Sequence, residues 1–187
     1  FAPLHHSAMK HAIGPRREMG VRTIFNLLGP LTNPAGAPNQ LIGVYSPQWV
    51  EPIAQVLAQL GSKHVLVVHS DDGMDEISIA APTQVAELKD GKVSTYSIAP
   101  EQLGIARGDK TRLTVKNAQE SVEKVRAALN NTPGPERDIV ALNSGAALYV
   151  AGLASSLKDG VQLAQQVIAS GAARDKLSAL VKLTSSL

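Results

Sequence analysis

Cysteine is absent from this chain of 187 residues, which excludes a disulfide-stabilised scaffold or a thiolate metal site and fits a cytoplasmic protein. Aromatic residues make up only 3%, so a core must be built from Ala, Val, Leu and Ile. The chain has no run of about 18 apolar residues and no signal-peptide pattern, so we expect neither a membrane span nor a targeting segment. The net charge of +2 is too small to indicate nucleic-acid binding by itself.

Charge is distributed unevenly along the chain. Residues 1–34 contain three histidines and two basic clusters but only one acid, Glu18. Residues 71–78, DDGMDEIS, carry the opposite charge. We interpret the first stretch as a binding region for an anionic substrate and the second as a metal-binding loop.

The spacing of apolar residues predicts an α/β fold. Residues 40–46 and 63–69 are short apolar runs typical of strands, and residues 47–60 between them have the spacing of an amphipathic helix that ends at Gly61. This order is a β-α-β unit, so we expect a central, mostly parallel sheet flanked by helices. A length of 187 residues is sufficient for one such domain, over residues 1–187.

The second half predicts a hairpin followed by helices. Residues 84–88 and 92–97 alternate in polarity around Asp90-Gly91, which is typical of a β-hairpin. From residue 117 the chain has helical periodicity, and Asn117 with Glu120 resembles a helix-capping pair. The helices are expected over residues 118–129, 138–153, 159–169 and 172–183. The expected buried stripe of the first helix is Ala118, Val122, Val125 and Leu129.

The basic opening stretch is interrupted by glycine and proline. Residues 4–13 have helical spacing, residues 16–19 predict a second short helix, and Gly29-Pro30 predicts a turn. Arg16 begins the short helix, where free backbone N–H groups favour an anion, and its guanidinium can bind a carboxylate or phosphate through a planar fork. The alternative is that Arg16 belongs to an ordinary basic surface.

The acidic loop follows the second predicted strand. In open α/β sheets, ligands collect at the carboxyl ends of the strands, which is where this loop begins. Adjacent Asp75 and Glu76 can provide the oxygen ligands that Mg²⁺ takes together with substrate phosphates. The alternative is a solvated acidic turn, because Asp-Gly pairs are common in turns, and the pattern alone leaves both open.

Other catalytic and metal motifs do not occur. The spacing of His5, His6 and His11 does not match a helical pair of metal ligands, so we reject a zinc site there. His64 and His69 flank a predicted strand and are interpreted as structural. The sequence contains no Ser-His-Asp order, Gly-x-Ser-x-Gly elbow, Walker motif or dinucleotide fingerprint.

The chain resembles anthranilate phosphoribosyltransferase over nearly its whole length. The likeness is carried by a series of phrases read in order: FAP, HHSAMKH, PRREMGVRTIFNLLGPLTNPA, QLIGVYSP, LVVHSDDGMDEIS and LNSGAALYVAG. The long basic phrase followed at a distance by DGxDE is far more specific than any single motif. Enzymes of this family join the amino group of anthranilate to C1 of phosphoribosyl pyrophosphate (PRPP), with release of pyrophosphate, in tryptophan biosynthesis.

The resemblance implies the residues of the site. Arg16 matches the family's anthranilate-binding arginine, and Asp75 and Glu76 match its Mg²⁺-binding acidic pair. The residues that match the lining of the aromatic-substrate site are Ala2, Pro3, His6, Met9, Gly29 and Pro30. The implied substrates are anthranilate and PRPP and the implied cofactor is Mg²⁺, with neither nucleic acid nor membrane as a partner. The resemblance singles out no general base.

Part of the family's architecture does not occur in this sequence. The family has an N-terminal helical bundle and a glycine-rich GTGGD phosphate loop, whereas this chain contains no Gly-Gly pair. We therefore expect the chain to be the C-terminal α/β portion of a larger two-domain enzyme and to be inactive alone. The homodimer that the family forms through the missing portion is expected for the complete enzyme.

Two other functions stay open at this point. A non-enzymatic relative of the same fold would bind nucleic acid through basic residues, namely Lys10, His11, Arg16, Arg17 and Arg22. The acidic loop and the modest net charge argue against that reading. A pyrimidine nucleoside phosphorylase shares the broad architecture, but it does not need Arg16 for a carboxylate.

Overall fold

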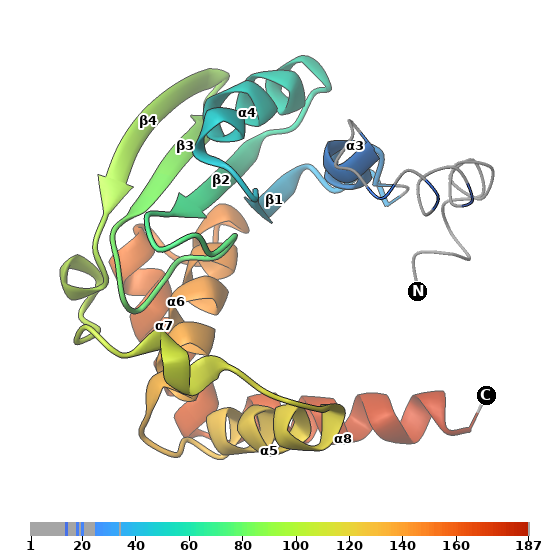
Figure 1. The fold of residues 1–187 in the computed structure, drawn as a ribbon, viewed down its shortest axis with the longest axis vertical. Coiled ribbons are helices and arrows are strands. Elements are labelled where there is room, and N and C mark those ends of the chain that lie inside the picture. Colours follow the sequence, from blue (N-terminus) through green and yellow to red (C-terminus); the bar gives the residue numbers. More distant parts are fainter. Residues whose placement is uncertain (1–13, 15–17, 19, 21–24, 34, 187) are drawn as a thin grey trace. The chain divides into compact units, whose positions relative to one another are not determined.

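The computed structural model describes the following parts of the chain: residues 14, 18, 20, 25–33 and 35–186 (Figure 1). The chain divides into two compact units, Phe1–Pro38 and Asn39–Leu187. The expectation of a single domain stays a prediction. None of the helices in the described part combines the length and the hydrophobicity that crossing a membrane requires.

The first unit contains helix α3, Phe25–Leu31. Gly29 and Pro30 lie inside this helix, so the predicted turn at this pair is wrong. Proline is tolerated there because the helix ends one residue later, and its missing N–H removes only one hydrogen bond from the last turn. Thr32 closes the helix through its N–H and its hydroxyl, which both donate to a carbonyl one turn back, at 3.0 and 2.8 Å. The helix predicted over residues 4–13 lies outside the described part.

The second unit contains a mixed four-stranded sheet in the order β1-β2-β3-β4 (Figure 1). The strands are β1 Asn39–Gly43, β2 His64–Ser70, β3 Thr83–Lys89 and β4 Lys92–Ile98. The α/β class is confirmed, and β1 and β2 are parallel as expected. However, β2–β3 and β3–β4 are antiparallel, so the sheet is not mostly parallel. The short connections after β2 contain no crossover helix, which a parallel neighbour requires.

The predicted β-α-β unit is confirmed. A short 3-10 helix, η2 Pro47–Trp49, and helix α4 Val50–Gln59 connect β1 to β2. The apolar face of α4 is buried as its spacing predicted, through Val50, Ile53, Ala54 and Leu57. Strand β2 is buried over almost its whole length, which explains its continuous apolar sequence.

The predicted hairpin is also confirmed. Asp90 and Gly91 separate β3 from β4 and have φ angles of 51° and 72°. Both values are positive, as a type I′ turn requires, and this turn matches the right-handed twist of the two strands. The turn sequence therefore specifies the pairing of β3 with β4.

The remaining helices of the second unit follow the hairpin. They are η3 Pro100–Leu103, η4 Lys110–Leu113, α5 Ala118–Leu129, α6 Pro135–Val150, α7 Leu157–Ala169 and α8 Ala172–Thr184. Helix α6 contributes Leu142, Ala146 and Val150 to the core next to β2, as its nearly all-apolar sequence predicted. It contacts α7 closely, because a Cβ on Gly160 would lie 2.2 Å from the carbonyl oxygen of Gly145.

The stripe predicted for α5 is wrong. Its cap is confirmed, since the Asn117 side chain accepts a hydrogen bond from the Glu120 N–H at 2.9 Å. However, Val122 and Val125 remain 41% and 47% exposed, and Ala128 is the residue that α5 buries. Amphipathic spacing shows that one face is apolar, whereas the neighbouring elements decide whether that face is covered.

A polar cluster surrounds Glu87 in the middle of β3. Its carboxylate accepts hydrogen bonds from the hydroxyls of Tyr149 and Tyr96, at 2.7 and 2.9 Å, and lies 2.9 Å from Nε2 of His64. Burial opposes ionisation of Glu87, but the hydrogen bonds from Tyr149, His64 and Tyr96 outweigh it and lower the pKa of Glu87. His64 is engaged in this cluster, in agreement with its predicted structural role.

Glu87→Gln is expected to lower the free energy of unfolding at neutral pH by about 2 kcal/mol, because hydrogen bonds to a charged group are lost. The pKa of Glu87 is lower in the folded than in the unfolded chain. Its contribution is therefore present above the unfolded value and disappears as the pH falls through the folded value. Urea unfolding measured from neutral to acid pH checks this, with exposed Glu123→Gln as the control. A difference between wild type and Glu87→Gln that stays constant with pH would contradict it.

Candidate functional site

The acidic loop, residues 71–82, connects β2 to β3 and leaves the carboxyl end of β2, as predicted (Figure 1). The carboxyl end of the parallel strand β1 lies beside it. Just beyond β1, the N–H of Val44 donates to the carbonyl of Val68 at 3.0 Å, and the carbonyl of Val44 lies 2.8 Å from Nδ1 of buried His69. The two strand ends are therefore held together where ligands bind in open α/β sheets.

A tight turn opens the acidic loop. The N–H of Ser70 donates to the carbonyl of Met74, and the N–H of Gly73 donates to the carbonyl of Ser70, both at 2.9 Å. Gly73 has a φ of +89°, which a residue with a side chain adopts only with strain. The Asp-Gly pair noted in the sequence is therefore part of a defined turn.

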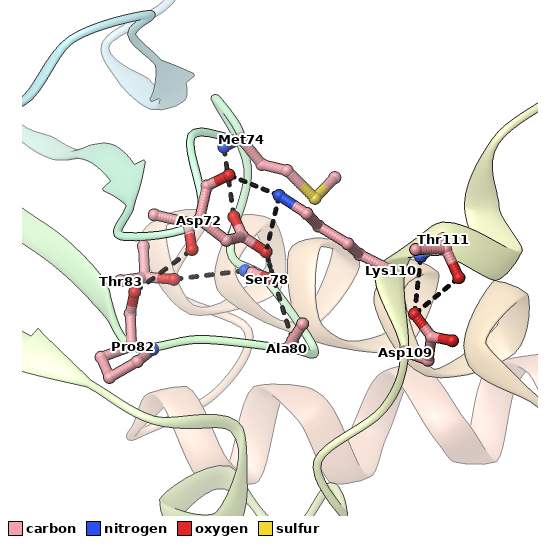
Figure 2. Close-up of polar contacts among 10 residues, drawn as sticks. Asp72, Met74, Ser78, Ala80, Pro82, Thr83, Asp109, Lys110 and Thr111 are labelled. Carbon is pink, nitrogen blue, oxygen red and sulfur yellow. Dashed lines mark hydrogen bonds and ion pairs between the residues drawn. The ribbon is translucent and has the colours of Figure 1, made fainter.

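Asp72 is the polar centre of this turn (Figure 2). Its carboxylate accepts hydrogen bonds from the Met74 N–H at 3.2 Å and from the Ser78 hydroxyl at 2.8 Å. Lys110 is the first residue of η4. Its ammonium group donates to the carbonyl oxygen of Asp72 and lies 3.8 Å from the Asp72 carboxylate. Burial opposes ionisation, but the bonds from Ser78 and Met74 and the charge of Lys110 lower the pKa of Asp72. Asp72 is ionised at neutral pH, and its carboxylate is engaged within the protein.

Asn143 on α6 anchors the chain on the C-terminal side of the acidic pair. Its side-chain oxygen accepts a hydrogen bond from the Ile77 N–H at 2.9 Å, and its amide group donates to the carbonyls of Ile77 and Ile139 at 3.0 Å. Ile77 and Ile79 are almost completely buried in the core. The chain is thus anchored directly after Glu76, by the apolar packing of Ile77 and by its two hydrogen bonds to Asn143.

Asn143→Ala is expected to lower the free energy of unfolding by about 3 kcal/mol, because the N–H and carbonyl of buried Ile77 lose their partners on α6. Chemical denaturation measures this change. Ser144→Ala, at the next and exposed position of α6, is the control and should change stability by less than about 0.5 kcal/mol. Equal effects of the two substitutions would show that Asn143 does not anchor the loop.

Gly43, the last residue of β1, allows the acidic loop to lie against the sheet. A Cβ at this position would lie 1.6 Å from the carbonyl oxygen of Asp75 and 2.6 Å from its carbonyl carbon. These are backbone atoms, so they cannot move aside without moving the loop. The backbone of Asp75 can therefore lie directly against β1 only because Gly43 has no side chain.

Asp75 and Glu76 are adjacent, and both side chains are exposed. Partial desolvation by the surrounding protein raises the pKa of Glu76, and the neighbouring Asp75 carboxylate raises it further. Two like charges beside each other in this position favour a bound cation, which would relieve the repulsion. Their neighbour Asp71 is engaged elsewhere, because its carboxylate accepts a hydrogen bond from Gln84 at 3.0 Å.

The acidic pair fits the way proteins hold Mg²⁺ with a phosphorylated substrate. Such sites use one or two carboxylates and leave the other positions to phosphate oxygens and water. A complete cage of protein ligands is not found in the described part, where no three or more His, Cys, Asp or Glu side chains are grouped for a metal. Asp75 and Glu76 would be the ligands of such an ion.

The other predicted site residues belong to the first unit. Gly29 and Pro30 lie in α3, Gly29 exposed and Pro30 half-buried. The remaining ones lie outside the described residues: Ala2, Pro3, His6, Met9 and Arg16. The basic residues considered for nucleic acid also lie outside, namely Lys10, His11, Arg16, Arg17 and Arg22.

Sequence reasoning missed three residues that shape the acidic loop: Gly43, Lys110 and Asn143. A glycine inside a predicted strand is a known sign of a close backbone approach, so Gly43 had a signal. Asn143 lies in the segment LNSGAALYVAG and is a polar residue in an apolar helix, which is also a signal. Lys110 had no signal, because the segment around it has neither helical nor strand periodicity.

Comparison with known proteins identifies the family. A family model described as "Glycosyl transferase family, a/b domain" matches residues 1–174. The chain belongs to this family. The resemblance to anthranilate phosphoribosyltransferases is confirmed as well. The protein of that name from Thioalkalivibrio sulfidiphilus is 61% identical over 186 residues, which are 100% of this chain and 55% of that protein. The one from Methylococcus capsulatus is 61% identical over 184 residues, which are 98% of this chain and 54% of that protein.

Solved structures of anthranilate phosphoribosyltransferases agree with the fold. The anthranilate phosphoribosyltransferase from Thermus thermophilus superposes with a TM-score of 0.90 at 43% identity, over 97% of this chain and 54% of that one. The enzyme from Saccharomyces cerevisiae in complex with PRPP and Mg superposes with a TM-score of 0.86 at 25% identity, over 97% and 53% of the two chains. The chain spans about half the length of the relatives it matches.

Proposed function

We propose that the protein transfers the phosphoribosyl group from PRPP to anthranilate, giving N-(5-phosphoribosyl)anthranilate and pyrophosphate, in tryptophan biosynthesis. Support comes from the relatives named anthranilate phosphoribosyltransferase, which match nearly the whole chain. Solved relatives hold PRPP with Mg, and 4-fluoroanthranilate, which are one substrate and an analogue of the other. We propose Mg²⁺ as the cofactor.

The observation that carries this proposal is the acidic pair at the carboxyl ends of β1 and β2. Asp75 and Glu76 are exposed, while the flanking Asp72 and Ile77 are fixed by hydrogen bonds. Exposed carboxylates on an anchored loop are suited to bind a metal ion whose other ligands are the diphosphate oxygens of a substrate that enters from solution.

The chemistry requires positioning more than a strong base. When bound, Mg²⁺ supplies charge neutralisation for the departing pyrophosphate. The chain's contribution at this loop is to hold two carboxylates in a constant position. Because C1 becomes oxocarbenium-like as the bond to pyrophosphate breaks, a fixed arrangement of charges lowers the barrier without later reorganisation.

Anthranilate binding is assigned to the first unit. We propose that Arg16 binds the carboxylate of anthranilate, and that the ring is lined by Ala2, Pro3, His6, Met9, Gly29 and Pro30. Phenylglyoxal modification followed by mass spectrometry tests the assignment of Arg16. Anthranilate should protect Arg16, whereas a pyrimidine nucleoside should not. Protection by the nucleoside, or by neither compound, would remove Arg16 from the anthranilate site.

The decisive assay uses the protein at its full natural length. Anthranilate fluorescence should fall only when both PRPP and Mg²⁺ are present. Phosphorolysis of uridine or thymidine without use of anthranilate would instead support a nucleoside phosphorylase. Salt-sensitive binding of nucleic acid without any turnover would support the non-enzymatic relative.

Two properties of the complete protein are part of the same proposal. We propose that the complete enzyme is a cytoplasmic homodimer and that residues 1–187 by themselves are inactive. The glycine-rich phosphate loop of the family is not among these residues. Light scattering after size-exclusion chromatography tests the dimer, and the fluorescence assay on residues 1–187 tests the second point.

A further inference from the structure

Lys110 approaches the acidic loop from a separate part of the chain, 38 residues after Asp72 (Figure 2). Its ammonium group donates to the carbonyl oxygen of Asp72 and lies 3.8 Å from the Asp72 carboxylate. The contact thus combines a hydrogen bond to the loop backbone with an ion pair to the loop's central side chain.

The backbone around Lys110 is arranged to make this contact. Asp109 caps η4, because its carboxylate accepts hydrogen bonds from the N–H of Thr111 at 2.9 Å and from its hydroxyl at 2.7 Å (Figure 2). One residue earlier, the N–H of Gly108 donates to the carbonyl of Ile79 at 2.8 Å, and a Cβ on Gly108 would lie 2.9 Å from Cδ1 of Ile79. The segment therefore runs directly against the end of the acidic loop.

General stability does not explain the contact well. The Lys110 side chain is 42% exposed, and ion pairs of exposed lysines contribute little to stability, since long side chains lose conformational entropy when they are held. The negative charge of the loop gives a better reason for the contact between Lys110 and Asp72. Four carboxylates lie within six residues, Asp71 to Glu76. Lys110 offsets the charge of Asp72, because its ammonium group lies 3.8 Å from that carboxylate.

We propose that Lys110 is a positioning residue for the metal carboxylates. By holding Asp72 from one side, while Asn143 holds Ile77 from the other, it keeps the intervening backbone in the conformation that presents Asp75 and Glu76 together. It also keeps Asp72 from competing with them for the ion. This inference rests on the proposed function, because it takes Asp75 and Glu76 to be the Mg²⁺ ligands.

The test compares Lys110→Met and Lys110→Arg with Lys92→Met, an exposed lysine at the start of β4, in the full-length protein. In Lys110→Met, the Mg²⁺ concentration for half-maximal activity should rise about tenfold, the scale on which loss of a supporting contact weakens metal sites. The KM for anthranilate should change less than about twofold. Without metal, amide hydrogen exchange at residues 73–76 should accelerate in Lys110→Met alone. Lys110→Arg, which keeps a donor and the charge, should restore part of the Mg²⁺ response.

Several outcomes would overturn the inference. These are a Lys110→Met variant with the wild-type Mg²⁺ response, an equal effect of Lys92→Met, or a Lys110→Met variant that fails to fold, since the last would assign Lys110 to general stability. The double variant Asp75→Asn with Glu76→Gln, in the same assay, separates this from a failure of the proposed function. If it keeps the Mg²⁺ response, the metal assignment itself is wrong. If it loses the response while Lys110→Met keeps it, only the role of Lys110 is wrong.

Discussion

The double substitution Asp75→Asn and Glu76→Gln is expected to remove the Mg²⁺ dependence of the full-length enzyme and to lower its turnover by about a hundredfold or more. This is the scale on which removal of one group that stabilises developing charge acts. The amides keep the shape of both side chains but no longer neutralise a cation. Initial rates of anthranilate consumption over a range of Mg²⁺ concentrations measure the effect.

Stability should not fall together with activity. The pKa of Glu76 is raised in the fold by desolvation and by Asp75, so the folded chain disfavours the charged form. Neutral side chains should therefore leave the melting temperature unchanged or slightly higher. A matched pair elsewhere, Asp90→Asn with Glu123→Gln, is the control and should retain full activity. An unaltered Mg²⁺ response of the Asp75 and Glu76 variant would remove these residues from the site.

Gly43→Ala is expected to damage activity strongly without touching any proposed ligand side chain. The added methyl group would lie 1.6 Å from the carbonyl oxygen of Asp75, so the loop must move away from β1. A displacement of about 1 Å at a reacting centre lowers rates by about a hundredfold. The strain should also lower the free energy of unfolding by about 1–3 kcal/mol, as overpacking does. Kinetics as a function of Mg²⁺ and chemical denaturation measure the two effects.

The control for Gly43→Ala is Gln40→Ala, in the same strand. This substitution removes atoms instead of adding them, so it should leave the Mg²⁺ response near that of the wild type. If Gly43→Ala keeps wild-type turnover and Mg²⁺ response, the position of Asp75 does not depend on the missing side chain. A loss of stability with unchanged kinetics would likewise separate the packing of the loop from its function.

Local patterns were sufficient for much of the second unit. Strand, helix and strand over residues 40–69 followed from apolar spacing. The hairpin followed from Asp90-Gly91 with its two positive φ angles. The Asn117 cap followed from side-chain chemistry alone. These features depend on residues close together in the chain, so the sequence contains the information directly.

Most of the errors arose where a neighbour decided the outcome. The spacing of Val122 and Val125 identified an apolar face of α5, but no neighbouring element in the described part buries these side chains. The error at Gly29-Pro30 is local instead: the pair has the composition of a turn but lies in the last turn of α3, where the missing N–H of proline removes only one hydrogen bond. The sheet is mixed because β3 returns beside β2, which the apolar run of β2 did not reveal.

By itself, the sequence determined the family likeness, the β-α-β unit, and the position of Asp75 and Glu76 in the loop that follows a buried strand. Contiguous motifs and periodicity suffice for these. Only the tertiary structure decided that Asp72 is a structural carboxylate, and that Gly43, Lys110 and Asn143 hold the loop on which the acidic pair stands. The contacts of Lys110 and Asn143 join residues 38 and 66 positions apart. Their existence depends on how the chain returns to the same edge of the sheet, which short-range sequence patterns do not encode.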